Sequence, residues 1–455
     1  MIKRALLSMA LVLAGCDTVP LQDTPTRAQI ADSTLPPMKS FSAPRPQVPS
    51  RSNANIAADF LALHFELESG RELPIMTRFE NPITVRVTGA PPPSLQADLA
   101  RLLSRLRNEA GIDIRQVGSG AANITIEAVG RSEIRRALPQ AACFVVPNIT
   151  SLADFRRERR REKTNWSLLS TRETLGIFLP NDATPQEVRD CLHEELAQAI
   201  GPLNDLYSLP ESVFNDDNMH TVLTGYDMLI LRATYAPELR SGMTRAQVAR
   251  VLPDLLARLN PAGNGIGRQR VSRTPRSWID AMQRALGPGA GLETRVRAAN
   301  EATRIAQGQG WTDQRRAFSH YTLGRMIQMS DADLAQRHYA TALKFLDQTP
   351  GTDLHKAHVR AQTAAYAISR GDGANALAQL RGPIEDVRRA ENAALLATMM
   401  LLQAEALDLE GRGEEAAATR LDSLGWARYG FGSDWAVRAL MRDVALLNPR
   451  NRLGG

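Results

Sequence analysis

The chain has 455 residues, of which 23% are charged, and its formal net charge is +6 at pH 7. This length is too great for one compact core, so we expect two or three folded domains. Aromatic residues make up only 5% of the chain, and the basic residues are scattered rather than gathered in a stripe. The composition therefore argues against a nucleic-acid partner.

Residues 1–16 have the features of an export signal. A basic start precedes an apolar run over residues 5–13, which is too short to span a bilayer. The sequence Leu-Ala-Gly-Cys that ends at Cys16 resembles the lipobox of bacterial lipoproteins. The resemblance implies that Cys16 is acylated and that the protein is held in the cell envelope, facing the periplasm. Asp17 leaves open which membrane, inner or outer, holds it. A plain secretory signal with a coincidental cysteine is the alternative.

Residues 17–52 are rich in Pro, Ser, Thr and Gln and have almost no apolar periodicity. A stretch of this composition buries too little apolar surface to offset the entropy lost on ordering it. We therefore expect a disordered tether that holds the folded part away from the bilayer.

An α+β domain is predicted over residues 53–260. Runs of apolar residues at helical spacing predict helices at 53–68, between Ser94 and Gly111, and after the capping pair Thr244 and Gln247. Strand-like alternation is found at 83–88, 112–117, 123–129 and 173–179.

The most informative helix of this domain spans Pro185 to Ile200, after a capping box made by Thr184 and Glu187. It contains Cys191. With Cys16 acylated, Cys143 and Cys191 remain as an even pair in an oxidising compartment, so we expect a disulfide bond between them.

The segment Cys191–Asp205 reads CLHEELAQAIGPLND and resembles the zinc helix of the metzincin metalloproteases, HExxHxxGxxH. In that family three histidines bind zinc, and the glutamate acts as general base on the metal-bound water. Alignment on His193 places Ala197 where the second histidine belongs. Alignment on Gly201 instead places Glu194, Gln198 and Asn204 at the three ligand positions and Glu195 at the position of the catalytic base.

Two later segments extend the resemblance, which covers about residues 75–240 and implies a zincin-like fold. Residues 212–215 occupy the place of the methionine turn, with Phe214 in place of Met, and residues 223–235 resemble the closing helix. The chain is also similar to an uncharacterised bacterial lipoprotein family that carries CxxEExxQxxGxxND instead of the zinc motif.

The substituted ligand set predicts a non-peptidase. Amide oxygens from Gln198 and Asn204 are weak ligands for zinc, and one carboxylate from Glu194 gives too little charge to hold calcium or magnesium tightly. We expect no cofactor, with zinc or another divalent metal as the alternative. His193 lies about 100° around the helix from Glu194, and we expect it to face solvent or an internal partner.

After a linker at residues 261–276, an all-α domain is predicted over 277–450. Small residues recur after short polar turns at Ala335, Ala376 and Ala416, which are 41 and 40 residues apart. This pattern resembles a tetratricopeptide-like array of helical hairpins. Such arrays commonly bind a protein or peptide on a concave face, and a domain that only packs on its neighbour is the alternative.

These features together predict a lipid-anchored envelope protein. A degenerate metzincin-like domain would serve binding or assembly, and the helical hairpins would contact a partner. The alternative is a metal-dependent hydrolase or peptidase in which Glu195 acts as general base at an atypical site.

Overall fold

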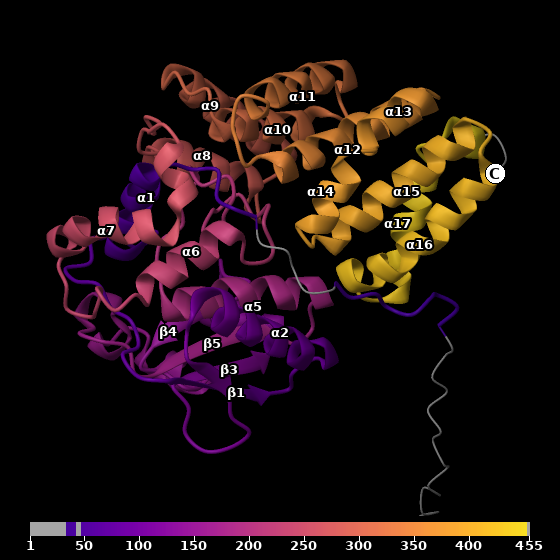
Figure 1. The fold of residues 1–455 in the computed structure, drawn as a ribbon. Helices are drawn as coiled ribbons and strands as arrows, with labels where there is room; N and C mark the ends of the chain where they lie inside the picture. The colour runs from indigo at the N-terminus through magenta and orange to yellow at the C-terminus, as the bar shows by residue number, and fades with distance from the viewer. Residues whose placement is uncertain (1–32, 42–46, 453–455) are drawn as a thin grey trace, which may run out of the picture.

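A computed structural model describes residues 33–41 and 47–452, and in it two regions follow one another along the chain (Figure 1). The first is a mixed α/β domain built on a five-stranded sheet, and the second is an all-helical region of packed helix pairs. This is the order of architectures that the sequence predicts. Cys16 and the export signal lie outside the described residues.

The sheet has the strand order β2-β1-β3-β5-β4. Neighbouring strands are parallel, except that β4 runs antiparallel to β5 at one edge. The sequence pattern does not predict β4, because four residues are too few to show an alternation. The strands are β1 (Ile83–Gly89), β2 (Ile114–Gln116), β3 (Ile124–Val129), β4 (Phe144–Pro147) and β5 (Leu175–Pro180).

Helices cover both faces of β5, all six residues of which are buried. Ile177 and Leu179 belong to the main core, which includes α2 and α5, whereas Phe178 between them joins a smaller core with α3 and α4. The alternation follows from the two-residue period of a strand. The helices of this domain are α1 (Asn53–Phe65), α2 (Pro93–Ala110), α3 (Arg131–Ala137), α4 (Leu152–Glu158), α5 (Pro185–Ile200), α6 (Gly225–Thr234) and α7 (Arg245–Leu259).

The helical region consists mainly of antiparallel pairs, α8 with α9, α10 with α11, α12 with α13 and α15 with α16. The recurring Ala335, Ala376 and Ala416 are fully buried, as packing positions should be. Gly324 allows α10 to approach α11, because a Cβ there would lie 2.6 Å from Tyr339 Cε1. The helices are α8 (Arg276–Leu286), α9 (Leu292–Gly308), α10 (Gln314–Ile327), α11 (Ala332–Leu346), α12 (Asp353–Ser369), α13 (Gly373–Leu380), α14 (Pro383–Arg389), α15 (Ala393–Leu409), α16 (Gly413–Phe431), α17 (Asp434–Ala445) and α18 (Pro449–Arg452).

The helical region packs directly on the α/β domain. Across this interface Arg189 of α5 forms a buried ion pair with Glu391, and Gln186 bonds both Asn392 and the amide of Ala394. Glu391 adopts a φ of 56°, a left-handed conformation that is uncommon outside glycine. The position of α5 is therefore set from both sides, by its own sheet and by the turn before α15.

Part of the stretch expected to form a tether contacts the helical region. Phe41 is buried and stacks on Trp426 with ring centroids 4.5 Å apart, and the Lys39 amide donates to Gly425 O at 3.0 Å. Ser33 donates to Asp434 at 2.5 Å. We call residues 33–41 the N-terminal strap, since they lie along α16 and the start of α17. Within the described part of the chain, no helix has the length and apolarity needed to cross a bilayer.

Candidate functional site

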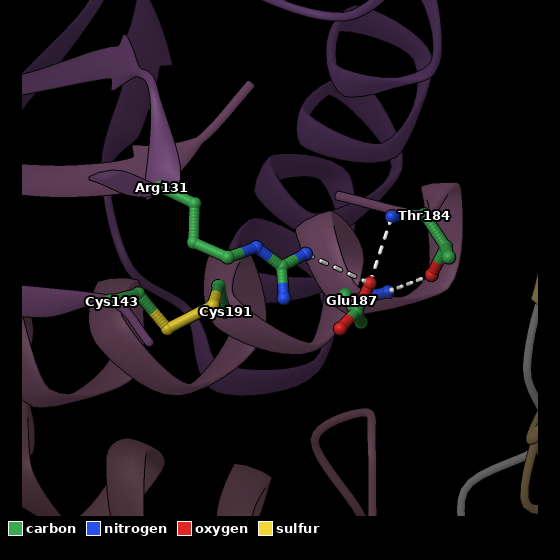
Figure 2. The surroundings of a disulfide bond; sticks show 5 residues. All are labelled: Arg131, Cys143, Thr184, Glu187 and Cys191. Carbon is green, nitrogen blue, oxygen red and sulfur yellow. Dashed lines mark hydrogen bonds and ion pairs between the residues drawn. A yellow bond between two sulfur atoms is a disulfide. The ribbon is translucent and has the colours of Figure 1, made fainter. Parts of the chain in front are cut away.

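Helix α5 begins at the predicted capping box. Thr184 Oγ1 accepts a hydrogen bond from the Glu187 amide at 3.2 Å, and the Glu187 carboxylate accepts one from the Thr184 amide at 2.9 Å (Figure 2). Arg131 of α3 donates to the same carboxylate at 3.4 Å. The start of α5 is therefore held by its own cap and by a neighbouring helix.

The predicted disulfide bond is confirmed. Cys143 and Cys191 are joined, with Cα atoms 5.9 Å apart and a sequence separation of 48 (Figure 2). Cys143 immediately precedes β4, so the bond ties the edge strand to the middle of α5. This is the only covalent cross-link among the described residues, and it lies next to the segment that resembles the zinc helix.

A buried arginine fixes the end of α5. Arg172 donates to the carbonyl oxygens of Gln198 at 2.7 Å, Ala199 at 2.8 Å and Gly201 at 2.5 Å. These are carbonyls that a helix terminus leaves without partners, and a cation there also complements the helix dipole. Burial lowers the pKa of Arg172 to about 10, so it remains charged near neutral pH.

Five carboxyl groups interact beside the second half of α5. Burial, and after it the charges of Glu68 and Asp216, raise the pKa of Glu194 from its ordinary value to about 7. Burial, then Glu194 and then Glu68 raise the pKa of Glu195 well above its ordinary range, and the pKa of Asp205 rises for the same reasons. These shifts favour the protonated forms of Glu195 and Asp205 at neutral pH. We call Glu68, Glu194, Glu195, Asp205 and Asp216 the acidic cluster.

The amides at the predicted ligand positions are engaged in internal hydrogen bonds. Gln198 Nε2 donates to Asp205 Oδ2 at 3.1 Å, whereas Asn204 Nδ2 donates to the Ala62 carbonyl of α1 at 3.1 Å. Glu195 Oε2 is buried and has no hydrogen-bond partner within the described part of the chain. The structure thus places Glu194, Glu195 and Gln198 near Asp205, and directs the Asn204 amide nitrogen toward α1.

Zinc, which the metzincin resemblance implies, does not fit these residues. One carboxylate and two amides form a hard, weakly charged donor set, and zinc prefers thiolate and imidazole. Over the described ranges, no group of three or more His, Cys, Asp or Glu side chains is arranged to hold a metal ion.

His193 cannot replace the missing zinc ligands. It is 2% exposed, and its Nδ1 accepts a hydrogen bond from the Leu223 amide at 3.1 Å. Burial, with the charges of nearby arginines, lowers its pKa well below the ordinary value, so the ring is a neutral acceptor. His193 therefore holds the segment that leads into α6 in place and does not contribute to a metal site.

The loop before α6 is organised by a buried carboxylate. Asp227 accepts from the Ser212 hydroxyl at 2.5 Å and from the amides of Val213 at 3.2 Å and Thr224 at 2.8 Å. Phe214, predicted to occupy the place of the turn methionine, is fully buried in the main core. The loop is therefore packed in the core, and its hydrogen bonds to Asp227 of α6 set its conformation.

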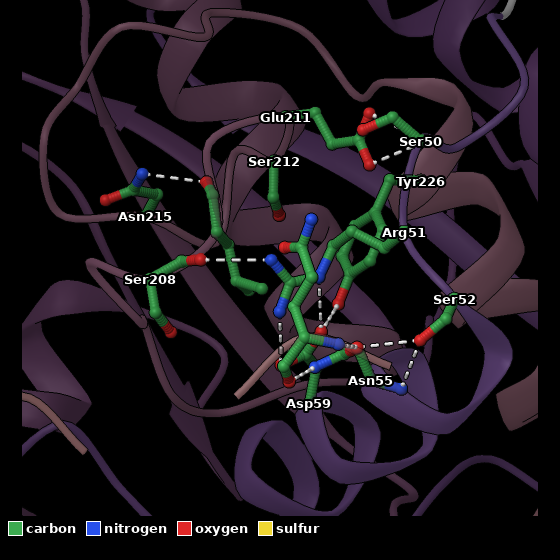
Figure 3. Close-up of polar contacts among 12 residues, drawn as sticks. Ser50, Arg51, Ser52, Asn55, Asp59, Ser208, Glu211, Ser212, Asn215 and Tyr226 are labelled. Atoms are coloured by element: carbon green, nitrogen blue, oxygen red, sulfur yellow. Dashed lines mark hydrogen bonds and ion pairs between the residues drawn. The ribbon is translucent and has the colours of Figure 1, made fainter. Parts of the chain in front are cut away.

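A second buried ion pair connects the segment before α1 to this loop. Arg51 contacts Asp59 at 2.8 and 3.1 Å and donates to the Ser208 carbonyl at 3.3 Å, while the Tyr226 hydroxyl donates to Asp59 at 3.2 Å (Figure 3). In the same view the Glu211 carboxylate accepts from the Ser50 amide at 3.0 Å. The contacts with Ser208, Tyr226 and Glu211 could not be predicted from the sequence, because each joins residues more than 150 positions apart in the chain.

A cavity of about 890 Å³ adjoins the acidic cluster. One wall is formed by α1, the turn after it and residues 204–208, and the other by residues 268–276 with α8. Carboxylates stand on the first wall and guanidinium groups mainly on the second, with Glu66 bonded to Arg273 at 2.8 Å. The charged lining residues are Asp59, Glu66, Glu68, Asp205, Arg245, Arg268, Arg270, Arg273 and Arg276.

A histidine cluster lies where the loop before α6 meets α12. His355 Nε2 is 2.7 Å from Asp217 Oδ2, and the His220 ring is 6.2 Å from the His355 ring. Burial is the main cause that lowers the pKa of His220 to about 4 and that of His358 to about 3. The sequence shows His355 and His358 three apart on one helix, but nothing in it identifies their partners in the α/β domain.

Comparison with known proteins identifies part of the chain. Searches among curated proteins and among solved structures find no match. The region that carries the sheet, α5, the acidic cluster and the loop before α6 does match a family. Residues 53–254 fit the model of the family described as "Protein of unknown function (DUF2927)".

Proposed function

We propose that the protein is a lipid-anchored component of the cell envelope whose α/β domain binds a ligand or partner and does not hydrolyse peptides with zinc. One observation carries the proposal about chemistry. The amides at two of the three zinc-ligand positions, Gln198 and Asn204, are used in hydrogen bonds to Asp205 and to the Ala62 carbonyl. A zincin-like fold is part of the same proposal, supported by four parallel strands, an antiparallel edge strand and a helix at the place of the zinc helix.

The cavity beside the acidic cluster is the proposed binding place. Its two walls carry opposite charges, and Arg268 and Arg270 have no ion-pair partner among the described residues. A planar guanidinium group suits a carboxylate or phosphate, which it can bond through two nitrogens. We therefore propose a ligand that carries both an anionic group for these arginines and a cationic or hydrogen-bonding group for the opposite wall.

The helical region is proposed to hold a protein or peptide partner. The pair of α15 and α16 already packs on the α/β domain, through contacts between α16 and α5, so this pair forms an internal interface. Met329, in the turn between α10 and α11, is 92% exposed. A photo-reactive residue can therefore replace it to crosslink a bound partner. Crosslinking to one defined protein from this position, and not from Leu168 of the α/β domain, is expected.

Metal analysis tests the proposed chemistry. Full-length protein purified without chelator should contain far less than one zinc per chain, and Glu194→Ala or Gln198→Ala should change nothing in that content. Stoichiometric zinc that is lost in both variants but kept in Glu173→Ala would overturn the proposal. Glu173 is a suitable control because it is an exposed carboxylate in the same domain.

The second candidate function is a hydrolase with Glu195 as general base. It is favoured by the buried Oε2 atom of Glu195, which has no hydrogen-bond partner among the described residues. Peptide hydrolysis by the purified protein that is abolished by Glu195→Gln and unaffected by Glu173→Gln would support this candidate. The absence of any such activity across a panel of divalent metals would exclude it.

Labelling tests the proposed anchor. Cells that express the full chain should incorporate radioactive palmitate into it, and Cys16→Ser should abolish the incorporation. An unlabelled wild-type protein, or a labelled Cys16→Ser variant, would contradict lipid attachment at Cys16.

A further inference from the structure

Helix α17 carries an exposed tryptophan next to the strap. Trp435 is 75% exposed, which makes it the most exposed aromatic side chain among the described residues. The other four tryptophans are buried or half-buried. An exposed indole of this size is unusual on a free surface, because its apolar ring costs free energy in water.

The residues around Trp435 form a basic stripe. At about 100° per residue, Arg438 and Arg442 fall within about 60° of Trp435 on the helix, and both are exposed. The acidic residues of α17, Asp434 and Asp443, fall about 100° and 80° away on either side. The face that carries the indole therefore presents arginines and no carboxylate of its own helix. We call Trp435, Arg438 and Arg442 the α17 stripe.

The start of the strap contacts this same helix. Ser33 bonds to Asp434 at 2.5 Å, and Arg438 donates to the Thr34 hydroxyl, so residues 33 and 34 lie at the edge of the stripe. Sixteen residues separate Cys16 from Ser33. A chain of sixteen residues cannot span more than about 55 Å. A lipid on Cys16 would thus keep the stripe within reach of the bilayer.

From these observations we propose that the α17 stripe is a membrane-contact surface that docks on anionic phospholipid. The inference rests on the proposed lipid anchor at Cys16. Tryptophan prefers the depth of the headgroups, where its ring is buried and its N–H stays hydrated, and arginines pair with the lipid phosphates. The strap bonds to the same helix, so a docked stripe would set the orientation of the α/β domain and its cavity relative to the membrane.

Fluorescence quenching tests the contact. The acylated full chain is placed in vesicles of phosphatidylethanolamine and phosphatidylglycerol, with part of the lipid brominated on its acyl chains. We expect quenching of the emission and a loss of most of that quenching in Trp435→Phe. A matched control restores one exposed tryptophan elsewhere, as Met329→Trp in the Trp435→Phe background, and should show no quenching. Equal quenching in wild type and Trp435→Phe would overturn the proposal.

The charge dependence gives a second readout. Unacylated Cys16→Ser chain should bind vesicles that contain phosphatidylglycerol and not vesicles of phosphatidylcholine alone. Arg442→Gln should weaken that binding roughly fivefold, the effect of about one arginine near a charged surface, and Arg337→Gln on α11 should not. An Arg442→Gln variant that binds as tightly as wild type would contradict a role for the stripe.

Failure of the anchor and failure of the stripe are distinguishable. Mass spectrometry of the purified chain reports whether Cys16 carries acyl groups, independently of any vesicle. If it carries none, the anchor proposal fails, and the binding of the unacylated chain to anionic vesicles still decides whether the stripe contacts lipid. If it is acylated and Trp435 remains unquenched, only the stripe proposal fails. Trp435 covered by residues 17–32 would give that second result.

Discussion

Replacing Glu194 by glutamine should stabilise the protein at alkaline pH. Burial and the neighbouring carboxylates Glu68 and Asp216 raise the pKa of Glu194 from 4.5 to about 7. Between these values the folded protein binds more protons than the unfolded chain, so its stability falls as the pH rises from 4.5 to 7. Above pH 7 the whole penalty is present. Each unit of pKa corresponds to about 1.4 kcal/mol, so the upper limit is about 3 kcal/mol.

Urea denaturation at two pH values is the assay. Glu194→Gln should unfold at nearly the same urea concentration as wild type at pH 4.5, and at a clearly higher concentration at pH 8. Glu173→Gln, which changes an exposed carboxylate, should show no such difference. A Glu194→Gln variant that is destabilised equally at both pH values would refute the reasoning. It would mean that the carboxylate makes a favourable contact in the folded protein rather than suffering repulsion.

Three further predictions concern contacts that hold α5 and the interface. Paired replacement of Cys143 and Cys191 by serine should lower the free energy of unfolding by about 4 kcal/mol, from the chain entropy of a 48-residue loop, as measured by urea denaturation under oxidising conditions. Arg189→Met should lower the free energy of unfolding by about 3–5 kcal/mol, because it leaves Glu391 buried without its partner. Adding Glu391→Leu should restore much of this loss, and a double-mutant cycle that shows simple additivity would contradict the pairing. Because the pKa of His358 is lowered to about 3 in the folded protein, the unfolded chain binds a proton there below pH 6.5 and the folded protein does not, so stability falls as the pH drops below 6.5. His358→Asn should therefore flatten the acid branch of the curve of Tm against pH. An unchanged curve would argue against this role.

The sequence predicted the local elements of the α/β domain well. The limits of α5 match, because a capping box and a proline mark its start and a glycine its end. The disulfide could also be predicted, since only two cysteines remained once Cys16 was assigned to lipid. By contrast, β4 is too short for a period to show. Helices α3 and α4 have seven residues each, too few for a clear helical period, and their apolar residues become a core only by packing on Phe178.

The candidate site could be predicted only in part. Alignment with a known motif located Glu194, Glu195 and Gln198, because these residues lie within five positions of one helix. Glu68 could not be predicted, since it comes from the turn after α1 and meets α5 only through the tertiary fold. The same holds for His355 and Asp217, which are 138 residues apart. Pairings of this kind depend on how the two regions dock, and no local pattern encodes that.

The strap has a consequence for the order of synthesis. Ser33 emerges early from the ribosome, but its partner Asp434 lies 401 residues later in the chain. The strap therefore cannot reach its final place until α16 and α17 have been made. A chain that is truncated before α16 would leave Phe41 exposed without Trp426 to stack on. The strap is thus an early part of the chain that reaches its final place late, and its burial requires synthesis through α17.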